Sequence, residues 1–297
     1  MEKQSVLAVT RCGNLDLRWG ERTYVMGILN VTPDSFSGDG VGADVKAALA
    51  KARQLAEEGA DIIDVGGEST RPGAPPVSVE EELKRVVPVI ERLAAELFVP
   101  ISIDSYKSEV AEKALEAGAK MLNDQWGLKR DPRLAELAAE WNVPIVLMSN
   151  QRDKGGYDAD LKRDTADYND PIAEITSSLK RSLEIASQYK VPRENIILDP
   201  GIGFGKSWRH DLEIIRRLAE LKALGRPILI GPSGKSFIGR VLDLPVSDRL
   251  EGTTASVAVG IANGADMVRV HQVRPVVRVC RMCDAIIRKE AKWARNR

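Results

Sequence analysis

The sequence predicts an α/β protein, a (β/α)8 TIM barrel, formed by a single domain over residues 1–297 with an N-terminal hairpin at 1–20. Short apolar runs alternate strictly with helical patterns, which implies parallel strands joined by right-handed crossovers. Eight such units occur and no ninth follows, which favours a closed barrel over an open sheet. No linker, low-complexity tract or charge block divides the chain.

The elements follow in order along the chain. The apolar stretches 6–9 and 15–19 flank Cys12-Gly13-Asn14 and predict a short hairpin before the barrel. Eight buried strands are predicted at 24–29, 61–65, 100–103, 120–123, 144–148, 195–199, 227–230 and 266–270. Helices are predicted at 43–58, 78–97, 107–117, 131–141, 168–189, 208–223, 234–263 (broken near Pro245) and 275–293. The hydrophilic stretch 150–167 is expected to be an irregular, mobile loop.

Composition excludes several classes of protein. Basic and acidic residues balance at 43 each, so we expect neither nucleic acid nor an acidic membrane surface as a partner. No apolar run approaches the roughly 18 residues of a membrane span, and residues 1–10 lack the features of a secretory signal. Three cysteines form no disulfide framework, which favours the cytoplasm. Cys280 and Cys283 are interpreted as buried or idle thiols on the last helix.

Polar side chains gather where the predicted strands end, which is the face of a barrel that carries the active site. They are Asn30, the residues from Asp64 to Arg71, Asp104, Asn123, Met148, Asp199, Lys235, Arg269 and His271. A buried salt bridge or a helix cap could explain any one carboxylate. Asp104, Asn123 and Asp199 together favour a ligand with several N–H donors, such as the edge of a pterin or a guanine.

Cations follow several other strands. Arg71, Lys235, Arg269 and His271 lie on three different loops, which suits an anion such as phosphate or diphosphate. A surface ion pair is the alternative for Arg71. Arg269 and His271 are two residues apart on a strand, so both are expected to point into the barrel at its rim.

Two glycine-rich segments carry no nucleotide motif. Residues 201–206 lack the dinucleotide spacing and follow the sixth strand. Residues 231–236 end in Gly-Lys-Ser like a P-loop, but Leu229 stands where the P-loop requires glycine. The loops after strands seven and eight of a barrel form its usual phosphate site, which gives Lys235 a role without ATP.

Together these motifs resemble the dihydropteroate synthase family over residues 24–273. The segments that carry the resemblance are 30–37 (NVTPDSFS), 64–73 (DVGGESTRPG), 123–124 (ND), 198–206 (LDPGIGFGK), 235–237 (KSF) and 269–271 (RVH). The resemblance implies condensation of 6-hydroxymethyl-7,8-dihydropterin diphosphate with 4-aminobenzoate in folate biosynthesis, with release of diphosphate. It also implies Mg2+ as cofactor, a homodimer, and substitution at the pterin methylene with carbocation character.

The resemblance assigns roles to particular residues. Its catalytic set is Asp104, Asp199, Lys235, Arg269 and His271. Asp104, Asn123, Asp199 and Lys235 would form the pterin pocket, and Asn30, Arg71, Arg269 and His271 the diphosphate and Mg2+ side, with Asn30 as metal ligand. Thr70, Pro72, Phe204, Ser233 and Lys235 would receive the aminobenzoate, and Met148 and Gly231 complete the substrate-binding set. The stretch 34–40 is expected to close over the second substrate.

The chain departs from the family pattern at four places. Gly234 and Gln272 stand where arginine and aspartate are usual, and 147–150 and 38–40 also differ. A pterin-binding methyltransferase domain acting on a corrinoid, or a non-catalytic pterin-binding paralogue, are the alternatives. The 30–37 segment with Arg71, Arg269 and His271 favours the synthase. A dimer could use the apolar stripe Val276, Val277, Cys280 and Ile287 on the last helix.

Overall fold

The predicted barrel is confirmed by the computed structural model, which describes residues 7–32, 41–69, 75–152, 170–288 and 293 and the backbone of 157–158 and 163–164. Eight parallel strands pair in the order β10-β7-β6-β5-β4-β3-β12-β11, and a bridge between Leu198 and Ile228 joins the two ends. The strands are β3 (Tyr24–Asn30), β4 (Ile62–Gly66), β5 (Ile101–Asp104), β6 (Met121–Asp124), β7 (Ile145–Met148), β10 (Ile196–Asp199), β11 (Leu229–Ile230) and β12 (Met267–Val270).

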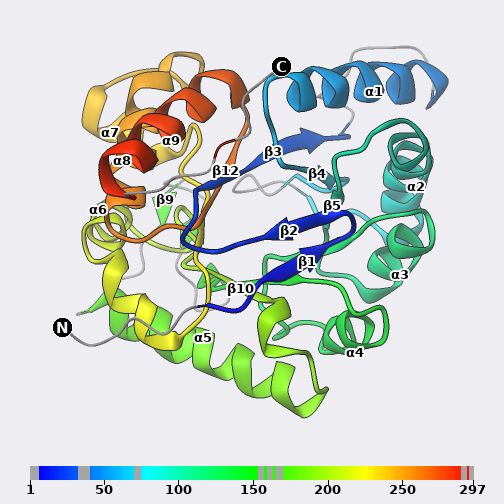
Figure 1. Ribbon diagram of the computed structural model, residues 1–297, viewed down its shortest axis with the longest axis horizontal. Coiled ribbons are helices and arrows are strands. Elements are labelled where there is room, and N and C mark those ends of the chain that lie inside the picture. Colours follow the sequence, from blue (N-terminus) through cyan, green and yellow to red (C-terminus); the bar gives the residue numbers. More distant parts are fainter. Residues whose placement is uncertain are drawn as a thin grey trace.

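Helices surround the strands on the outside of the barrel (Figure 1). They are α1 (Val41–Glu57), α2 (Val79–Glu96), α3 (Ser108–Glu116), α4 (Arg133–Glu140), α5 (Pro171–Gln188), α6 (Trp208–Arg216), α7 (Ser236–Leu242), α8 (Leu250–Ala262) and α9 (Val273–Ile287). Short 3-10 turns lie at Arg193–Asn195, Leu218–Leu224 and Val246–Asp248. The predicted break near Pro245 is confirmed, because α7 ends at Leu242 and Pro245 precedes a 3-10 turn.

The N-terminal hairpin lies across one end of the barrel (Figure 1). It pairs β1 (Thr10–Cys12) with β2 (Leu15–Leu17), so the predicted hairpin exists, but 6–9 was the wrong first strand. Cys12 pairs with Leu15, which leaves Gly13 and Asn14 as a two-residue turn, and Gly13 has φ +58°. Cys12, Leu17 and Trp19 pack against Met26 and other inward-facing strand residues and fill this end of the barrel.

The apolar stripe of α9 faces the barrel, not a partner chain. Val276, Val277 and Cys280 are buried in the main core, so the expectation that these three form a dimer surface was wrong, whereas Ile287, the fourth residue of the predicted stripe, is 45% exposed. The outer face of a barrel strand is apolar and must be covered, and α9 covers it with this stripe. The helix also ends at Ile287, six residues before its predicted end, and Trp293 donates its Nε1–H to Asp284.

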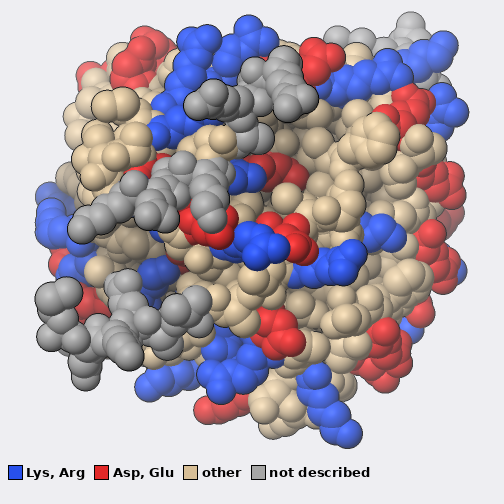
Figure 2. Space-filling model, in the orientation of Figure 1, with Lys and Arg blue, Asp and Glu red and all other residues tan. Residues whose placement is uncertain are grey.

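Part of the stretch expected to be irregular is paired, because β8 (Tyr157–Asp158) runs antiparallel to β9 (Arg163–Asp164). No helix among the described residues is long and apolar enough to cross a membrane. Figure 2 shows positive and negative side chains interspersed on the hairpin face, without a field of one sign.

Candidate active site

The predicted polar layer forms one rim of the barrel, because strand register places its members side by side. Asn30 of β3 pairs with Gly66 of β4, Gly66 with Asp104 of β5, and Asp104 with Asn123 of β6. On the other side, Asp199 of β10 pairs with Met148 of β7. All of these are last or next-to-last residues of parallel strands, so they meet at the carboxyl end of the barrel.

Arg269 reaches from β12 across the barrel mouth and joins two carboxylates. Its Nε lies 2.6 Å from Asp64 Oδ2, and its Nη2 lies 2.6 Å from Asp104 Oδ2. Asn123 Nδ2 donates to the same Asp64 oxygen at 2.9 Å. The alternative that Asp104 forms a buried salt bridge is therefore correct, and its ion pair with Arg269 lies inside the predicted pocket. Burial raises the pKa of Asp104, and the guanidinium of Arg269 opposes that rise.

Asp199 has a different environment from Asp104. Its Oδ1 accepts the backbone N–H of Gly201 at 2.7 Å, and it forms no ion pair within 4.0 Å among the residues described. Burial raises its pKa to about 6, while nearby Lys206 and Lys235 pull in the other direction. A buried carboxylate that stays ionised at neutral pH with few partners is suited to accept N–H donors from a ligand.

Lys235 and Phe204 form one wall of this region. The Lys235 ammonium lies 4.1 Å from the centre of the Phe204 ring. Gly203 makes this approach possible, because a Cβ at its position would lie 2.9 Å from Lys235 Cδ. Burial, together with the positive charges of Arg152 and Arg269, lowers the pKa of Lys235 to about 8. The loop that carries Phe204 is held by buried Lys206, whose Nζ donates to the carbonyls of Ser149, Gly201 and Phe204.

His271 is more exposed than Arg269, and the expectation that both side chains point into the barrel at its rim stays a prediction. β12 ends at Val270, and the alternation of a strand does not extend to His271, which is exposed at the rim. Its Nδ1 lies 3.0 Å from Ser233 Oγ, and its backbone N–H donates to the same oxygen. Ser233 and His271 therefore mark one edge of the mouth, beside Gly231 and Arg269.

Several predicted residues lie outside the described part of the chain. They are Thr70, Arg71 and Pro72 and the stretch 34–40 expected to close over the site. Their assigned roles remain predictions.

The structure adds residues to which sequence reasoning gave no role. Asp64 belongs to the predicted polar layer. It lies two residues before Gly66 on β4, so both residues face the same side of the strand, and this spacing could have indicated from the sequence that Asp64 faces the site. Gln125 donates to Asp104. Arg152 lies 4.6 Å from the Phe204 ring centre, in a stretch whose sequence carried no motif.

Asn30 is the described residue that could help to hold Mg2+. A Cβ added to Gly66 would lie 3.5 Å from Asp104 Oδ2 and 3.8 Å from Asn30 Oδ1, so the missing side chain leaves space between these oxygens. No cluster of three or more acidic, histidine or cysteine ligands occurs among the described residues. One amide oxygen suits Mg2+, which is commonly held by one or two protein oxygens and the phosphates of a substrate.

Comparison with known proteins defines the class to which this barrel and rim belong. The model of the pterin-binding enzyme family matches residues 26–271. Dihydropteroate synthase of Bacillus subtilis is 50% identical over 273 residues, 92% of each chain. That of Escherichia coli is 40% identical over 264 residues, 89% of this chain and 92% of its own.

Solved structures give the same result. Dihydropteroate synthase of Clostridium difficile, crystallised in the presence of pteroic acid, has 48% identity and a TM-score of 0.84, covering 91% of this chain and 98% of its own. The Xanthomonas albilineans enzyme with 4-aminobenzoic acid has 40% identity and a TM-score of 0.85, covering 94% and 97%. The chain belongs to the dihydropteroate synthase family, the enzymes of folate biosynthesis that the sequence motifs predicted.

Proposed function

We propose that this chain condenses 6-hydroxymethyl-7,8-dihydropterin diphosphate with 4-aminobenzoate and releases diphosphate. The observation that carries the proposal is the rim itself, where Asp104, Asn123 and Asp199 face one barrel mouth that Arg269 spans. A pterin edge has several N–H donors, and buried carboxylate and amide oxygens are the acceptors that they require. A corrinoid methyltransferase needs pterin acceptors too, but it has no use for cations at a leaving diphosphate.

The carboxylates and the cationic side chains have different tasks in this reaction. The bond between the pterin methylene carbon and the diphosphate oxygen breaks, and its electron pair leaves with diphosphate. The amine nitrogen of 4-aminobenzoate forms the new bond to that carbon and loses a proton to water. Asp104 and Asp199 hold the pterin and stabilise the positive charge that develops on it, while Arg269 and His271 stabilise the leaving diphosphate. No side-chain nucleophile is required.

Lys235 and Phe204 would serve both substrates. The Phe204 ring offers a flat surface against which the aminobenzoate ring can pack, with Lys235 between it and the pterin pocket. Asn30 would hold Mg2+ together with the diphosphate oxygens. When bound, that ion neutralises part of the diphosphate charge.

Incubation with the pterin diphosphate, 4-aminobenzoate and Mg2+ tests the proposal. We expect diphosphate release that depends on 4-aminobenzoate and a product that contains both rings. Diphosphate release without that dependence, or none, would refute it. The second outcome would favour a pterin-binding paralogue without activity.

We also propose that the chain is a cytoplasmic homodimer. Free thiols at Cys12, Cys280 and Cys283 are consistent with a reducing compartment. Met282 and Ile286 of α9 are 62% and 71% exposed, so a dimer surface on this helix would use its outer face. Sedimentation of the wild type and of Ile286→Glu checks this, and a wild type that sediments as a monomer would contradict it.

A further inference from the structure

A buried lysine binds the backbone of the loop that carries Phe204. Lys206 is only 2% exposed, and its Nζ donates to three backbone carbonyls. They are those of Ser149 at 2.7 Å, Gly201 at 2.9 Å and Phe204 at 3.1 Å. An ammonium has three N–H donors, so each has a carbonyl acceptor. Ser149 directly follows β7, and the other two residues follow β10, so one ammonium joins the ends of two neighbouring strands at the barrel mouth.

The shape of this loop depends on contacts outside its own backbone. Gly201 and Gly205 have φ values of +71° and +70°, in the left-handed region that favours glycine. Glycine loses more conformational freedom on folding than any other residue, so the loop needs other contacts to fix it. The loop also packs closely on the segment after β7, because a Cβ on Gly205 would lie 2.5 Å from the carbonyl carbon of Gln151.

Asp199, which directly precedes this loop, is held without the ammonium. Its backbone belongs to β10, and its carbonyl accepts the N–H of Ser149 at 2.9 Å. Phe204 lies five residues beyond the end of β10, and its carbonyl accepts the Lys206 ammonium and, at 3.3 Å, the N–H of Gln151. Removal of the ammonium should therefore displace Phe204 and leave the backbone of Asp199 in place.

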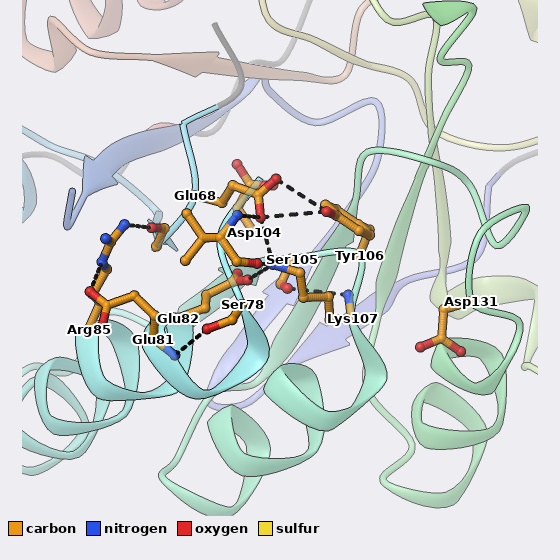
Figure 3. A network of polar contacts seen from close by, with 12 residues as sticks. Glu68, Ser78, Glu81, Glu82, Arg85, Asp104, Ser105, Tyr106, Lys107 and Asp131 are labelled. Carbon is orange, nitrogen blue, oxygen red and sulfur yellow. Dashed lines mark hydrogen bonds and ion pairs between the residues drawn. The ribbon is translucent and has the colours of Figure 1, made fainter. Parts of the chain in front are cut away.

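Another largely buried lysine shows the contacts expected where an ammonium joins two helices. Lys107 donates to Glu68 Oε2 at 2.6 Å and to Glu82 Oε2 at 2.5 Å, and Figure 3 shows these side chains converging from separate elements. Two carboxylates offset that charge, and the contacts join α2 to the residue that precedes α3. Lys206, in contrast, binds backbone carbonyls of two segments that border the pocket.

We propose that Lys206 is a positioning residue for 4-aminobenzoate, because its ammonium fixes the backbone of Phe204, against whose ring the aminobenzoate would pack, to the end of β7. This inference rests on the proposed synthase function. Displacement of a substrate-binding group by about 1 Å can cost up to roughly 100-fold in rate. The effect should appear in the KM for the second substrate, and much less in pterin binding.

Lys206→Met tests the proposal in the full-length protein. We expect the KM for 4-aminobenzoate to rise about tenfold or more, while the Kd for the pterin diphosphate rises less than about threefold. The positive charge of Lys206 also lowers the pKa of Asp199, which is about 6 in the wild type. The Kd is therefore measured at about pH 7.5, where this carboxyl stays mostly ionised even if its pKa rises by about one unit.

Lys222→Met is the matched control. Its ammonium lies 2.5 Å from buried Asp266, which precedes β12 and therefore lies at the amino end of the barrel, opposite the mouth. The control should leave both the KM and the Kd unchanged. Hydrogen exchange gives a readout besides activity. The amides of Phe204 and Gln151 should exchange about tenfold or more faster, relative to amides of the core strands, in Lys206→Met and not in the control.

The positioning role is overturned by an unchanged KM or unchanged exchange, by equal losses in the binding of both substrates, or by the same changes in the control. If Lys206→Met does not fold, Lys206→Gln decides, since its shorter side chain keeps two N–H donors. It should raise the KM in the same direction by a smaller factor, and an unchanged KM would overturn the proposal. A wild type without aminobenzoate-dependent diphosphate release would instead refute the proposed function, so the two failures are distinguishable.

Discussion

Replacement of Asp199 by asparagine should raise the stability of the protein relative to wild type as pH rises from about 4 to about 7, while it weakens pterin binding. Burial raises the pKa of Asp199 from 3.8 to about 6. Between those pH values the folded state holds a proton that the unfolded state has released, so stability falls as pH rises. The shift is about 2 pKa units, which at about 1.36 kcal/mol per unit amounts to about 3 kcal/mol.

The amide side chain of the Asp199→Asn variant does not titrate, and its oxygen can still accept the Gly201 N–H. The unfolding free energy of Asp199→Asn relative to wild type should therefore rise by about 3 kcal/mol between about pH 4 and about pH 7. This window lies below the pKa of Lys235, which is about 8. Any constant cost of the substitution cancels, because only the change with pH is compared. Urea unfolding followed by circular dichroism at several pH values gives the quantity.

Binding gives the second half of the test. A carboxylate that accepts pterin N–H groups is replaced by an amide that presents a donor, so pterin affinity should fall by about 100-fold or more, equivalent to about 3 kcal/mol. Asp124→Asn is the matched control. Burial also raises the pKa of Asp124 to about 6, but its oxygens accept the backbone N–H groups of Trp126 and Leu128. It should show a similar pH-dependent gain with a much smaller change in pterin affinity. A flat difference between Asp199→Asn and wild type across this pH range would refute the reasoning.

Three other residues give shorter tests. Burial lowers the pKa of Lys235 to about 8, so its side chain is charged below that pH and neutral above it. The value of kcat/KM should therefore fall as pH rises through about 8 in the wild type. This fall should be absent in Lys235→Met, and a fall that persists in the variant would contradict the assignment. His271→Ala should weaken inorganic diphosphate about tenfold and pterin hardly at all in calorimetry, whereas equal losses would count against its role. Asp64→Asn should lower the pKa of Asp104, since the Asp64 charge raises it; carbon-13 NMR of the carboxyl carbons measures this, and a rise would show the sign to be wrong.

Strand order and the position of the polar rim were predictable from sequence because both follow from local patterns. Apolar runs fix the strands, and the last residue of a parallel strand must lie at the carboxyl end of the barrel. Asp104, Asn123 and Asp199 were therefore placed correctly without coordinates. His271 lies one residue beyond the end of β12, so strand alternation alone does not determine where its side chain points.

Contacts between distant segments were not predictable in the same way. Arg269 joins Asp64 and Asp104 across 205 and 165 residues of chain. Lys206, a lysine in a glycine-rich loop, gives no sequence sign that it is buried and donates to three carbonyls. The stripe on α9 has the period of an amphipathic helix, but that period is the same for a face on the barrel and a face on a partner.

The pairing of Arg269 with Asp104 shows why a salt bridge and a ligand site are not exclusive interpretations here. A buried carboxylate requires a partner in the absence of ligand, and Arg269 provides one at 2.6 Å. Asp64, at the same distance from Nε of the guanidinium, keeps Arg269 paired if pterin N–H groups take over Asp104. Substrate could then replace one of two ion pairs without leaving the arginine without a partner. The cluster thus gives both Asp64 and Asp104 an ion pair when no ligand is bound, and it leaves Arg269 near the mouth where the diphosphate must leave.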